Sequence, residues 1–339
     1  MSSTTYQPVS RKSEEEFELN ERQRMYESSP PSNGALSRLS LFLRQRKRAV
    51  IFVIIAVLII LGLASAEHSG VRQRIPALLA EKDGLEPILG AKTEREYGFT
   101  LVAPTYKRVE RLPTFLSNYA NGTIPSLRRI VLLWNDVENE PPTSFTDTLT
   151  SYTVPIIIEQ RGINSLNQRF KLSENIRTNA ILAIDDDIIF KPEDIELGYQ
   201  TWHQYGLGRK RMVGYVPREV RDGTYVVERL PTYSMVLTKT AFFHIDWMKA
   251  YWSEDARITD VRNFVEENSN CEDILMAFIH AHYTRVPPLF VDAPSEDLGT
   301  GGISFKPGHM EARTACVRKF TEAFGEDTLV PNDMYIKRY

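Results

Sequence analysis

The chain has 339 residues, of which 42% are hydrophobic and 25% charged, and its formal net charge is −3. This balance excludes a globally basic nucleic-acid-binding protein, so any such role would need a local basic patch. The length allows one large domain with accessory segments.

The N-terminal 48 residues are polar and rich in Ser, Glu, Arg and Pro, without a steady apolar period. We expect residues 1–48 to form a disordered cytosolic tail. Residues 49–66 (AVIFVIIAVLIILGLASA) then give eighteen positions without a charge. At about 1.5 Å per residue they reach roughly 27 Å, enough to cross a thin bilayer. Basic residues, which stay on the cytosolic side of a membrane, directly precede this run at Arg44, Arg46, Lys47 and Arg48.

The apolar run predicts a single transmembrane signal-anchor over 49–66, a stem over 67–95 and a lumenal domain over 96–339. A cleaved signal peptide ending in the A-x-A pattern at 64–66 and a buried core helix are the alternatives, although the leader is long for a signal peptide. The lumenal part contains a sequon, with Asn121 as its glycosylation acceptor, and both cysteines, Cys271 and Cys316. An oxidising compartment would let the cysteines pair and could add about 4 kcal/mol, the alternative being two buried free thiols.

Four short apolar runs follow in the lumenal part, at residues 99–103, 129–134, 154–159 and 179–184. Each is short and almost continuously apolar, which favours strands covered on both faces, as in a parallel sheet. Helical patterns occur at 111–120 and 191–205, and Pro192 suits the first turn of the second. The sequence therefore predicts a layered α/β architecture.

Three aspartates, Asp185, Asp186 and Asp187, directly follow the fourth predicted strand. Ligands gather at the carboxyl ends of strands in open α/β sheets. Because alternate side chains of an extended segment point to one side, Asp185 and Asp187 could face one ligand. Hard carboxylate oxygens suit Mg²⁺ or Mn²⁺ bound together with a diphosphate. The alternative is a set of solvated loop residues, with the third aspartate capping the helix that starts near Lys191.

Two later stretches also carry polar groups suited to chemistry. Glu272 and Asp273 begin a predicted helix, where they either complement the helix dipole or stabilise positive charge at a sugar's anomeric carbon. The other stretch, 299–313, is rich in glycine and predicts either an ordinary surface loop or one that closes over a nucleotide diphosphate. Its cationic or hydrogen-bonding residues are Lys306, His309 and Arg313. Pairing of the two cysteines would bring both stretches to one site.

Seven sequence blocks, taken in order, resemble those of one known family. They are T-Y-x-R at 105–108, W-N at 134–135, T-N-A-x-L-x-x-D-D-D at 178–187, G-Y-V-P-R at 214–218, Y-S-M-V-L at 233–237, N-C-x-D-I at 270–274 and H-x-x-x-R-x-x-C at 309–316. Any one is unspecific, but seven in sequence are a strong signal. From about residue 99 to residue 339 the chain resembles the exostosin-type domain of glycosyltransferase family 64. It is similar to the small exostosin-like α-N-acetylhexosaminyltransferases.

The resemblance implies a GT-A fold with a Rossmann-like mixed sheet, a UDP-sugar donor, Mn²⁺ as cofactor and retention of the anomeric configuration. It implies transfer of an N-acetylhexosamine, GlcNAc or GalNAc, to a glycan or glycolipid acceptor. The protein would be a single-pass type II protein of the Golgi or endoplasmic reticulum membrane. No nucleic acid partner is expected, and a homodimer is left open. Two mechanisms are also left open. One is double displacement through Asp273, and the other is front-face attack with the departing phosphate oxygen as base.

Residue roles follow from the matching motifs. The resemblance assigns contacts with the nucleotide sugar to Thr105, Arg108, Asn135, Asn164, Arg169, Asp185, Asp186 and His309. Asp187 would be the principal metal ligand, with Asp185 beside it. Asp273 would lie beneath the reacting sugar carbon, and Arg313 would contact the diphosphate or the donor sugar. Cys271 and Cys316 match a family disulfide.

Departures from the family pattern bear on sugar and acceptor specificity and leave the metal residues intact. They are Pro104 in place of Gln, Asp136 in place of Asn, Ser165 and Asn167 in place of arginines, and Glu272 in place of Asp. One alternative function is transfer of another sugar, such as mannose from a GDP-sugar, to a sphingolipid head group. Another is a non-catalytic anchored module that binds a sugar nucleotide. Phosphotransferases that use such an aspartate pair usually carry it after the first strand of their fold. Here three predicted strands precede the aspartates, so this class is disfavoured.

Overall fold

The computed structural model describes residues 84–93, 95–299 and 307–338. The predicted cytosolic tail, the signal-anchor and most of the stem lie outside the described residues, and so does Lys306. Among the helices that are described, none is long and apolar enough to cross a membrane.

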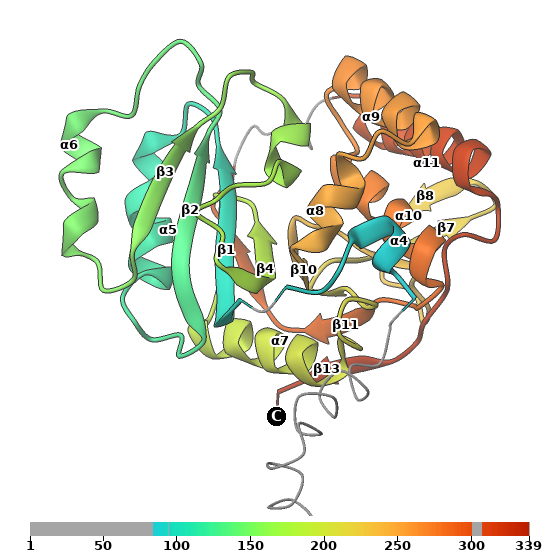
Figure 1. Cartoon of the computed structure of the whole chain (residues 1–339), viewed down its shortest axis with the longest axis horizontal. Helices are drawn as coiled ribbons and strands as arrows, with labels where there is room; N and C mark the ends of the chain where they lie inside the picture. Colours follow the sequence, from blue (N-terminus) through green and yellow to red (C-terminus); the bar gives the residue numbers. More distant parts are fainter. Residues whose placement is uncertain (1–83, 94, 300–306, 339) are drawn as a thin grey trace, which may run out of the picture. The chain divides into compact units, whose positions relative to one another are not determined.

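Within the described residues, an eight-stranded sheet organises the domain in the order β13-β11-β6-β10-β4-β1-β2-β3. Its parallel half consists of β1 (Glu96–Thr105), β2 (Leu127–Trp134), β3 (Ile156–Gln160) and β4 (Thr178–Ile184). The apolar runs predict these four strands, with small shifts at their ends. Figure 1 shows β1 and β2 side by side, with β3 at the outer edge.

The other half of the sheet is mixed in direction. β10 (Thr240–His244) runs antiparallel to β4 and to β6 (Val213–Gly214). β11 (Leu289–Asp292) runs parallel to β6 and to β13 (Tyr335–Lys337). Smaller pairings join β5 (Ile188–Phe190) to β12 (Ser295–Asp297), and β7 (Pro217–Arg221) to β8 (Thr224–Val226) and β9 (Met235–Val236). The prediction of a mixed α/β sheet is confirmed.

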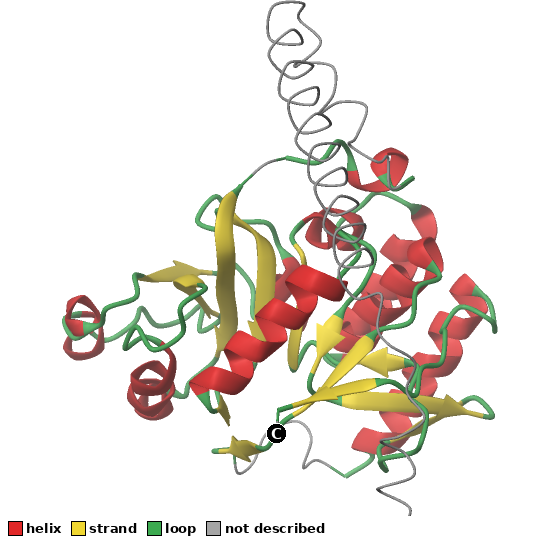
Figure 2. Ribbon diagram, turned by 90° about the horizontal axis from the view of Figure 1, so that it is seen from below, coloured by secondary structure: helices red, strands yellow, loops and turns green. Residues whose placement is uncertain are grey.

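Apolar side chains cover both faces of the sheet, because its strands are apolar on both sides. On one face, Leu101 of β1 belongs to a core shared with α5 (Leu112–Tyr119) and α7 (Pro192–Tyr205). On the other, Val102 belongs to a core shared with α8 (Asp246–Tyr251), α9 (Ala256–Asn268), α10 (Glu272–Thr284) and α11 (His309–Phe324). Figure 1 shows the second group of helices on the side away from α5. Seen from below, α7 crosses in front of the sheet (Figure 2).

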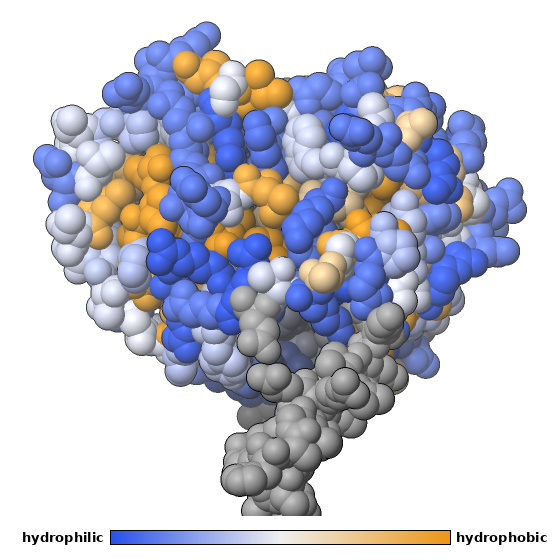
Figure 3. All heavy atoms as spheres, viewed as in Figure 1, coloured by the Kyte–Doolittle hydropathy of each residue, from blue (hydrophilic) through white to orange (hydrophobic). Residues whose placement is uncertain are grey.

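The remaining helical elements are short. They are α4 (Glu86–Leu89), α6 (Thr143–Thr146) and single 3₁₀ turns at Val109–Arg111, Leu149–Ser151 and Leu166–Phe170. Of the longer helices, α10 is buried over its first ten residues, Glu272–Ala281, whereas others bury one side only. α9, for example, buries Ile258, Val261 and Val265, which lie at helical spacing. On the face drawn in Figure 3, hydrophilic residues cover most of the periphery and hydrophobic residues gather toward the middle.

Two helix starts test specific predictions. α7 begins at Pro192 with Lys191 as its N-cap, as the position of the proline predicts. No side chain caps α7, so the alternative in which Asp187 caps this helix is wrong. α10 begins at Glu272 with Asp273 next, which confirms that both carboxylates lie in its first turn.

Candidate active site

The carboxyl ends of neighbouring strands meet at one edge of the sheet. β1 ends at Thr105, Asn135 follows β2, and Asp185 follows β4. The Asn135 amide nitrogen donates a hydrogen bond of 2.9 Å to the Thr105 carbonyl oxygen, which joins two of these ends. Thr105, Asn135 and Asp186 are buried. The sheet therefore brings together several of the donor-binding residues predicted from the sequence.

Each of the three aspartates is paired with an arginine. Arg108 Nη1 donates to Asp186 Oδ1 at 3.0 Å and to Asp187 Oδ2 at 2.8 Å. Arg169 Nη2 donates to Asp185 Oδ1. The positive charge that three adjacent carboxylates require is thus supplied, in the protein itself, by arginines.

A third arginine, not predicted from the sequence, completes this arrangement. Arg111 Nη1 lies 3.9 Å from Asp187 Oδ2, and Arg111 belongs to the 3₁₀ turn that leads into α5. Arg111 follows Arg108 by one helical turn, which explains why both reach the same carboxylate. The only sequence signal for Arg111 was its position one turn after Arg108, the last residue of the T-Y-x-R block.

Burial shapes the charge state of the aspartates. It raises the pKa of Asp186 to about 6, although the Thr105 hydroxyl and Arg108 act in the opposite direction. Burial also raises the pKa of Asp185, against the effect of Arg169. Among the described atoms, Asp186 Oδ2 and Asn135 Oδ1 are buried without a hydrogen-bond partner. Such oxygens need a partner, which a bound ligand would supply.

The residues present fit a divalent cation that is shared with a ligand. In the part of the chain that the structure describes, no group of three or more His, Cys, Asp or Glu side chains is placed to hold a metal by itself. Mg²⁺-like ions commonly take one or two carboxylates and complete their coordination with phosphate oxygens and water. The Asp187 and Asp185 oxygens match that donor set. They do not match an all-protein metal cage.

A neighbouring strand approaches Asp187 closely. The Leu298 amide nitrogen donates to the Asp187 carbonyl oxygen at 2.7 Å, just after β12. At Gly299, an added Cβ would lie 2.6 Å from Asp187 Oδ2 and 2.9 Å from Asp297 Oδ1. Lys239 Nζ lies 3.1 Å from the other carboxylate oxygen of Asp297. Gly299 is the first residue of the glycine-rich stretch that was predicted to be a loop. This position must be glycine, because the Asp187 carboxylate occupies the space that a side chain would fill.

Besides the aspartate triplet, the site has a second charged centre, the ion pair of Asp273 and Arg313, which joins α10 to α11. Arg313 Nη2 donates to Asp273 Oδ1 at 3.0 Å and to Oδ2 at 2.8 Å. Both side chains are buried. Burial alone would raise the pKa of Asp273, but the charge of Arg313 and its hydrogen bonds bring that pKa below its usual value. Asp273 is therefore ionised at neutral pH.

Arg169 links the two centres. Its Nη1 lies 3.5 Å from Glu272 Oε1 in the first turn of α10, while its Nη2 holds Asp185 at the end of β4. Burial, aided by repulsion from Asp273, raises the pKa of Glu272 to about 7. The aspartate cluster and the Asp273–Arg313 pair therefore belong to one site.

The predicted disulfide is present between Cys271 and Cys316. Cys271 directly precedes α10, and Cys316 lies one turn after Arg313 in α11. The bond therefore holds together the two helices that carry the ion pair. It also places the start of α10 beside α11, as the prediction that the two later sequence stretches share a site requires.

Some predicted site residues lie at the margin. Asn164 is exposed after β3, and among the described residues its side chain contacts none of the charged groups. His309 is the first residue of α11, with its Nδ1 3.4 Å from Asn270 Nδ2. Asn270 Oδ1 in turn lies 3.5 Å from Arg313 Nη1, so His309 is near the ion pair. Asn121 is exposed, as a glycosylation acceptor requires, and its modification remains a prediction.

Ser165 and Asn167, the two positions where the resemblance predicts arginines, contact other groups. Asn167 Nδ2 donates to Glu266 Oε2 at 2.9 Å, and Ser165 Oγ donates to the same oxygen. Tyr251 donates its hydroxyl to Asn167 Oδ1. These contacts fasten the segment before Arg169 to α9 and α8. They leave Arg169 as the arginine of this segment that reaches the aspartates.

Comparison with known proteins identifies the class. Residues 99–339 match the family described as the glycosyl transferase family 64 domain, and the chain belongs to this family. It is a glycosyltransferase of the exostosin type, which confirms the resemblance drawn from the motifs.

Named relatives support the same class. The chain is 33% identical to glycosylinositol phosphorylceramide mannosyl transferase 1 of Arabidopsis thaliana, over 70% of this chain and 75% of that protein. It is 31% identical to glucosamine inositolphosphorylceramide transferase 1 of Oryza sativa subsp. indica, over 89% of this chain and 40% of the relative. It is 33% identical to human exostosin-2, over 67% of this chain and 32% of the relative. The chain thus spans less than half of the last two.

A solved structure of Staphylococcus aureus TarS 1–349 in complex with UDP-GlcNAc is also similar. It has a TM-score of 0.40 and 14% identity, over 63% of this chain and 60% of that one.

Proposed function

We propose that this glycosyltransferase transfers an N-acetylhexosamine from UDP-GlcNAc or UDP-GalNAc to a glycan or glycolipid hydroxyl, with Mn²⁺ as cofactor and with retention of the anomeric configuration. The observation that carries the proposal is the Arg169 bridge. It joins Asp185, a carboxylate suited to a metal and diphosphate, to Glu272, which directly precedes the Asp273 that is paired with Arg313. A sugar nucleotide needs both halves, one for its diphosphate and one for its reacting sugar.

The proposed donor site uses the residues at the sheet edge. Thr105, Arg108, Asn135, Asn164, Arg169, Asp185, Asp186 and His309 would contact the nucleotide sugar. Asp187, with Asp185 beside it, would hold Mn²⁺. When bound, the cation would neutralise charge on the diphosphate leaving group. Arg108 would exchange part of its contact with Asp187 for the donor phosphates, because a guanidinium binds phosphate and carboxylate with the same geometry.

The proposed chemistry breaks the bond between the anomeric carbon and the diphosphate oxygen. Arg313 would stabilise negative charge on that oxygen, and ionised Asp273 would stabilise positive charge developing on the sugar. In the front-face route the acceptor hydroxyl bonds to the anomeric carbon and gives its proton to the departing phosphate oxygen. In the double-displacement route the Asp273 carboxylate first bonds to the anomeric carbon and displaces the diphosphate. The acceptor hydroxyl then bonds to that carbon, releases the carboxylate and gives its proton to the departed phosphate oxygen. A covalent sugar on Asp273 would support the second route.

A second candidate is transfer of another hexose, such as mannose from a GDP-sugar, to a sphingolipid head group. The relative that favours it is the Arabidopsis glycosylinositol phosphorylceramide mannosyl transferase 1, because this chain spans 75% of its length. The two candidates share the metal, the catalytic pair and the acceptor class of glycolipids. They differ in the base of the nucleotide and in the sugar.

The proposed location is the Golgi or endoplasmic reticulum membrane, as a single-pass type II protein with its catalytic domain in the lumen. The apolar run at 49–66 and the basic residues before it support this topology. The Cys271–Cys316 disulfide supports an oxidising compartment.

The test is donor hydrolysis by the purified full-length chain, across UDP- and GDP-sugars, with Mn²⁺ or with EDTA. We expect Mn²⁺-dependent turnover of UDP-GlcNAc or UDP-GalNAc, abolished in Asp187→Ala and retained in Asp147→Ala, an exposed residue after α6. Turnover of a GDP-sugar alone would establish the second candidate. Turnover that persists in EDTA or in Asp187→Ala would contradict the role given to the metal.

A further inference from the structure

The Arg313 guanidinium is covered by an aromatic ring. Its Cζ lies 4.7 Å from the ring centroid of Tyr225, a buried residue of β8. Its Nη2 is committed to Asp273, and its Nη1 faces Asn270. A cation over an aromatic face is attracted by the ring's negative potential, and this attraction is strongest where water is excluded. Tyr225 therefore limits the directions in which Arg313 can turn.

Tyr225 is itself held from two sides. Arg218 Nε donates to the Tyr225 hydroxyl oxygen at 3.1 Å, and the Tyr225 amide nitrogen donates to Thr314 Oγ1 at 3.3 Å. Thr314 follows Arg313 in α11, so this hydrogen bond fixes the hairpin of β7 and β8 to the helix right next to Arg313. The ring has little freedom to leave the guanidinium.

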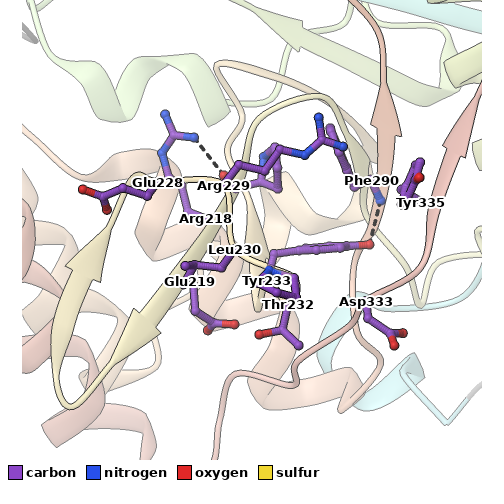
Figure 4. A pocket seen from close by; sticks show the side chains of 12 residues that line it. Arg218, Glu219, Glu228, Arg229, Leu230, Thr232, Tyr233, Phe290, Asp333 and Tyr335 are labelled. Atoms are coloured by element: carbon purple, nitrogen blue, oxygen red, sulfur yellow. Dashed lines mark hydrogen bonds between the residues drawn. The ribbon is translucent and has the colours of Figure 1, made fainter.

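Arg218 is anchored outside this contact. Figure 4 shows it among the residues lining a pocket of about 150 Å³, where its Nη1 donates to the Pro217 carbonyl oxygen at 2.8 Å. Burial raises the pKa of Tyr225, although Arg313 acts to lower it. The phenol is therefore neutral and can accept the hydrogen bond from Arg218. This gives the G-Y-V-P-R block at 214–218 a physical connection to the site.

We propose that Tyr225 is a positioning residue that holds Arg313 in the orientation needed for the leaving group, with Arg218 fixing Tyr225 in turn. The inference rests on the role proposed for Arg313. It differs from a purely structural role, because the face of the ring matters more than the volume of the side chain. Without the ring, Arg313 keeps Asp273 as a partner but gains freedom to turn away from the diphosphate.

The first experiment compares Tyr225→Leu with Tyr225→Phe in the full-length chain. Leucine fills much of the space without an aromatic face, whereas phenylalanine keeps the face and loses the hydroxyl group with its hydrogen bond from Arg218. We expect Tyr225→Leu to lower kcat by about tenfold, the scale of one desolvated cation–π contact, with donor KM changed less than about threefold. Tyr225→Phe should keep about half of wild-type kcat. Equal loss in both variants, or no loss in Tyr225→Leu, would overturn the proposal.

Tyr335→Leu is a control for a cation–π contact outside the site, at an exposed tyrosine. Tyr335 also lies beneath a guanidinium, since Arg229 Cζ is 5.7 Å from its ring centroid, but Arg229 pairs with Asp292 and not with the site. Its removal should leave kcat and KM unchanged. A similar fall in kcat for Tyr335→Leu would attribute the effect to general loosening of the fold and overturn the proposal.

A second measurement does not depend on turnover. A double-mutant cycle of Tyr225→Leu and Arg313→Gln, read from urea unfolding, isolates the contact between the two side chains. We expect the two changes to be coupled. The folding equilibrium constant of the double variant should be several-fold larger than the value predicted by adding the effects of the two single variants. Additive effects would overturn the proposal even if the wild type were inactive towards every donor. Coupling in an inactive protein would instead show that the proposed function, and not the contact, had failed.

Discussion

Asp273 and Arg313 form an ion pair across 40 positions of sequence, in which Arg313 Nη2 donates to both carboxylate oxygens and both side chains are buried between α10 and α11. The pair explains how a carboxylate can stay ionised where burial acts against it. In the proposed function it also keeps a cation at the place where the diphosphate would leave. Stability and chemistry are therefore coupled at this contact, which makes it the most informative place to perturb.

Removing one partner of the pair should harm both properties. Arg313→Gln leaves a buried carboxylate without its cation, which typically costs about 3–5 kcal/mol. The same change should lower kcat by about 100-fold or more, the usual effect of losing one group that stabilises transition-state charge. Urea unfolding and steady-state donor hydrolysis measure the two effects separately.

Arg318→Gln provides the control on the same helix, because Arg318 is exposed. It should stay within about twofold of wild type in kcat and close to it in stability. The double variant Asp273→Asn/Arg313→Gln should be more stable than Arg313→Gln alone, since no unpaired charge remains. If the double variant were the less stable, the ion pair would not be the source of the penalty.

The disulfide should contribute to the same contact. Its two cysteines are separated by 45 positions, and closing a loop of that length stabilises by about 4 kcal/mol on the chain-entropy model. Because these are the two cysteines of the chain, a reductant acts on this bond alone. We expect dithiothreitol, and the variant with both cysteines changed to serine, to lower the urea midpoint and kcat together. An unchanged midpoint after verified reduction would refute this.

The sequence predicted the sheet edge well, for a physical reason. Strands β1 to β4 are apolar runs of ordinary length, and parallel strands place their carboxyl ends at one edge. That rule alone brings Thr105, Asn135 and Asp185 together. In contrast, β6 and β9 have two residues each, too few for a period to be read, and no sequence pattern predicted them.

The charge partners were harder to predict, because they depend on tertiary contacts. An aspartate triplet invites a metal hypothesis, yet the neighbours that the fold supplies are Arg108 and Arg169. The family motifs predicted donor contacts for both arginines, which remain predictions, and did not indicate that the arginines pair with the triplet. Nothing in the sequence indicated that Tyr225 contacts Arg313, because a single aromatic residue in a short hairpin forms no recognisable pattern. Such contacts follow from how the elements pack.

Arg108 should compete with a cation for Asp187. The two are 2.8 Å apart, and Arg108 is only partly buried, so the contact is worth about 1 kcal/mol or less. Arg108→Gln should therefore raise the affinity for free Mn²⁺ by up to about fivefold, measured by electron paramagnetic resonance without nucleotide. It should weaken binding of Mn²⁺-UDP, because the diphosphate loses a cationic partner.

Lys107→Gln is the neighbouring control, since Lys107 pairs with exposed Glu138 and not with the triplet. It should leave both affinities unchanged. Weaker binding of free Mn²⁺ in Arg108→Gln would show that the arginine supports the metal site and does not compete with it.

The acid stability of the domain should depend on His244. Burial lowers the pKa of His244 from 6.5 to about 4, although Asp246 acts to raise it, and its Nδ1 accepts a hydrogen bond from the Asp246 amide. A group whose folded pKa is depressed gives stability that is full above its unfolded pKa. That stability, about 3 kcal/mol, is lost as the pH falls from 6.5 towards 4.

The variant His244→Asn tests this dependence, because its amide oxygen can still accept from the Asp246 nitrogen. It should flatten the fall in unfolding free energy between pH 6.5 and pH 4, as measured in urea. Exposed His203, changed to asparagine, should keep the wild-type slope. A slope in His244→Asn as steep as in the wild type would assign the acid sensitivity to other groups.

Gly299 offers the sharpest test of the proposed metal site. A methyl group there would lie 2.6 Å from Asp187 Oδ2, closer than side chains approach one another, so Gly299→Ala must displace the carboxylate. Changes in the shell that orients a metal ligand typically weaken binding by about 10- to 100-fold, and we expect that loss for Mn²⁺. Electron paramagnetic resonance on the full-length protein measures it without reference to turnover.

Gly162→Ala is the matched control, because an added Cβ at Gly162 meets nothing within 4 Å, and neither glycine has the positive φ that would strain alanine. It should bind Mn²⁺ as the wild type does. Because the two substitutions are chemically identical, a difference between them reports only what surrounds each site. Equal affinities in both variants would mean that Asp187 does not hold the metal, and the ligand would then have to be sought among the other aspartates of the triplet.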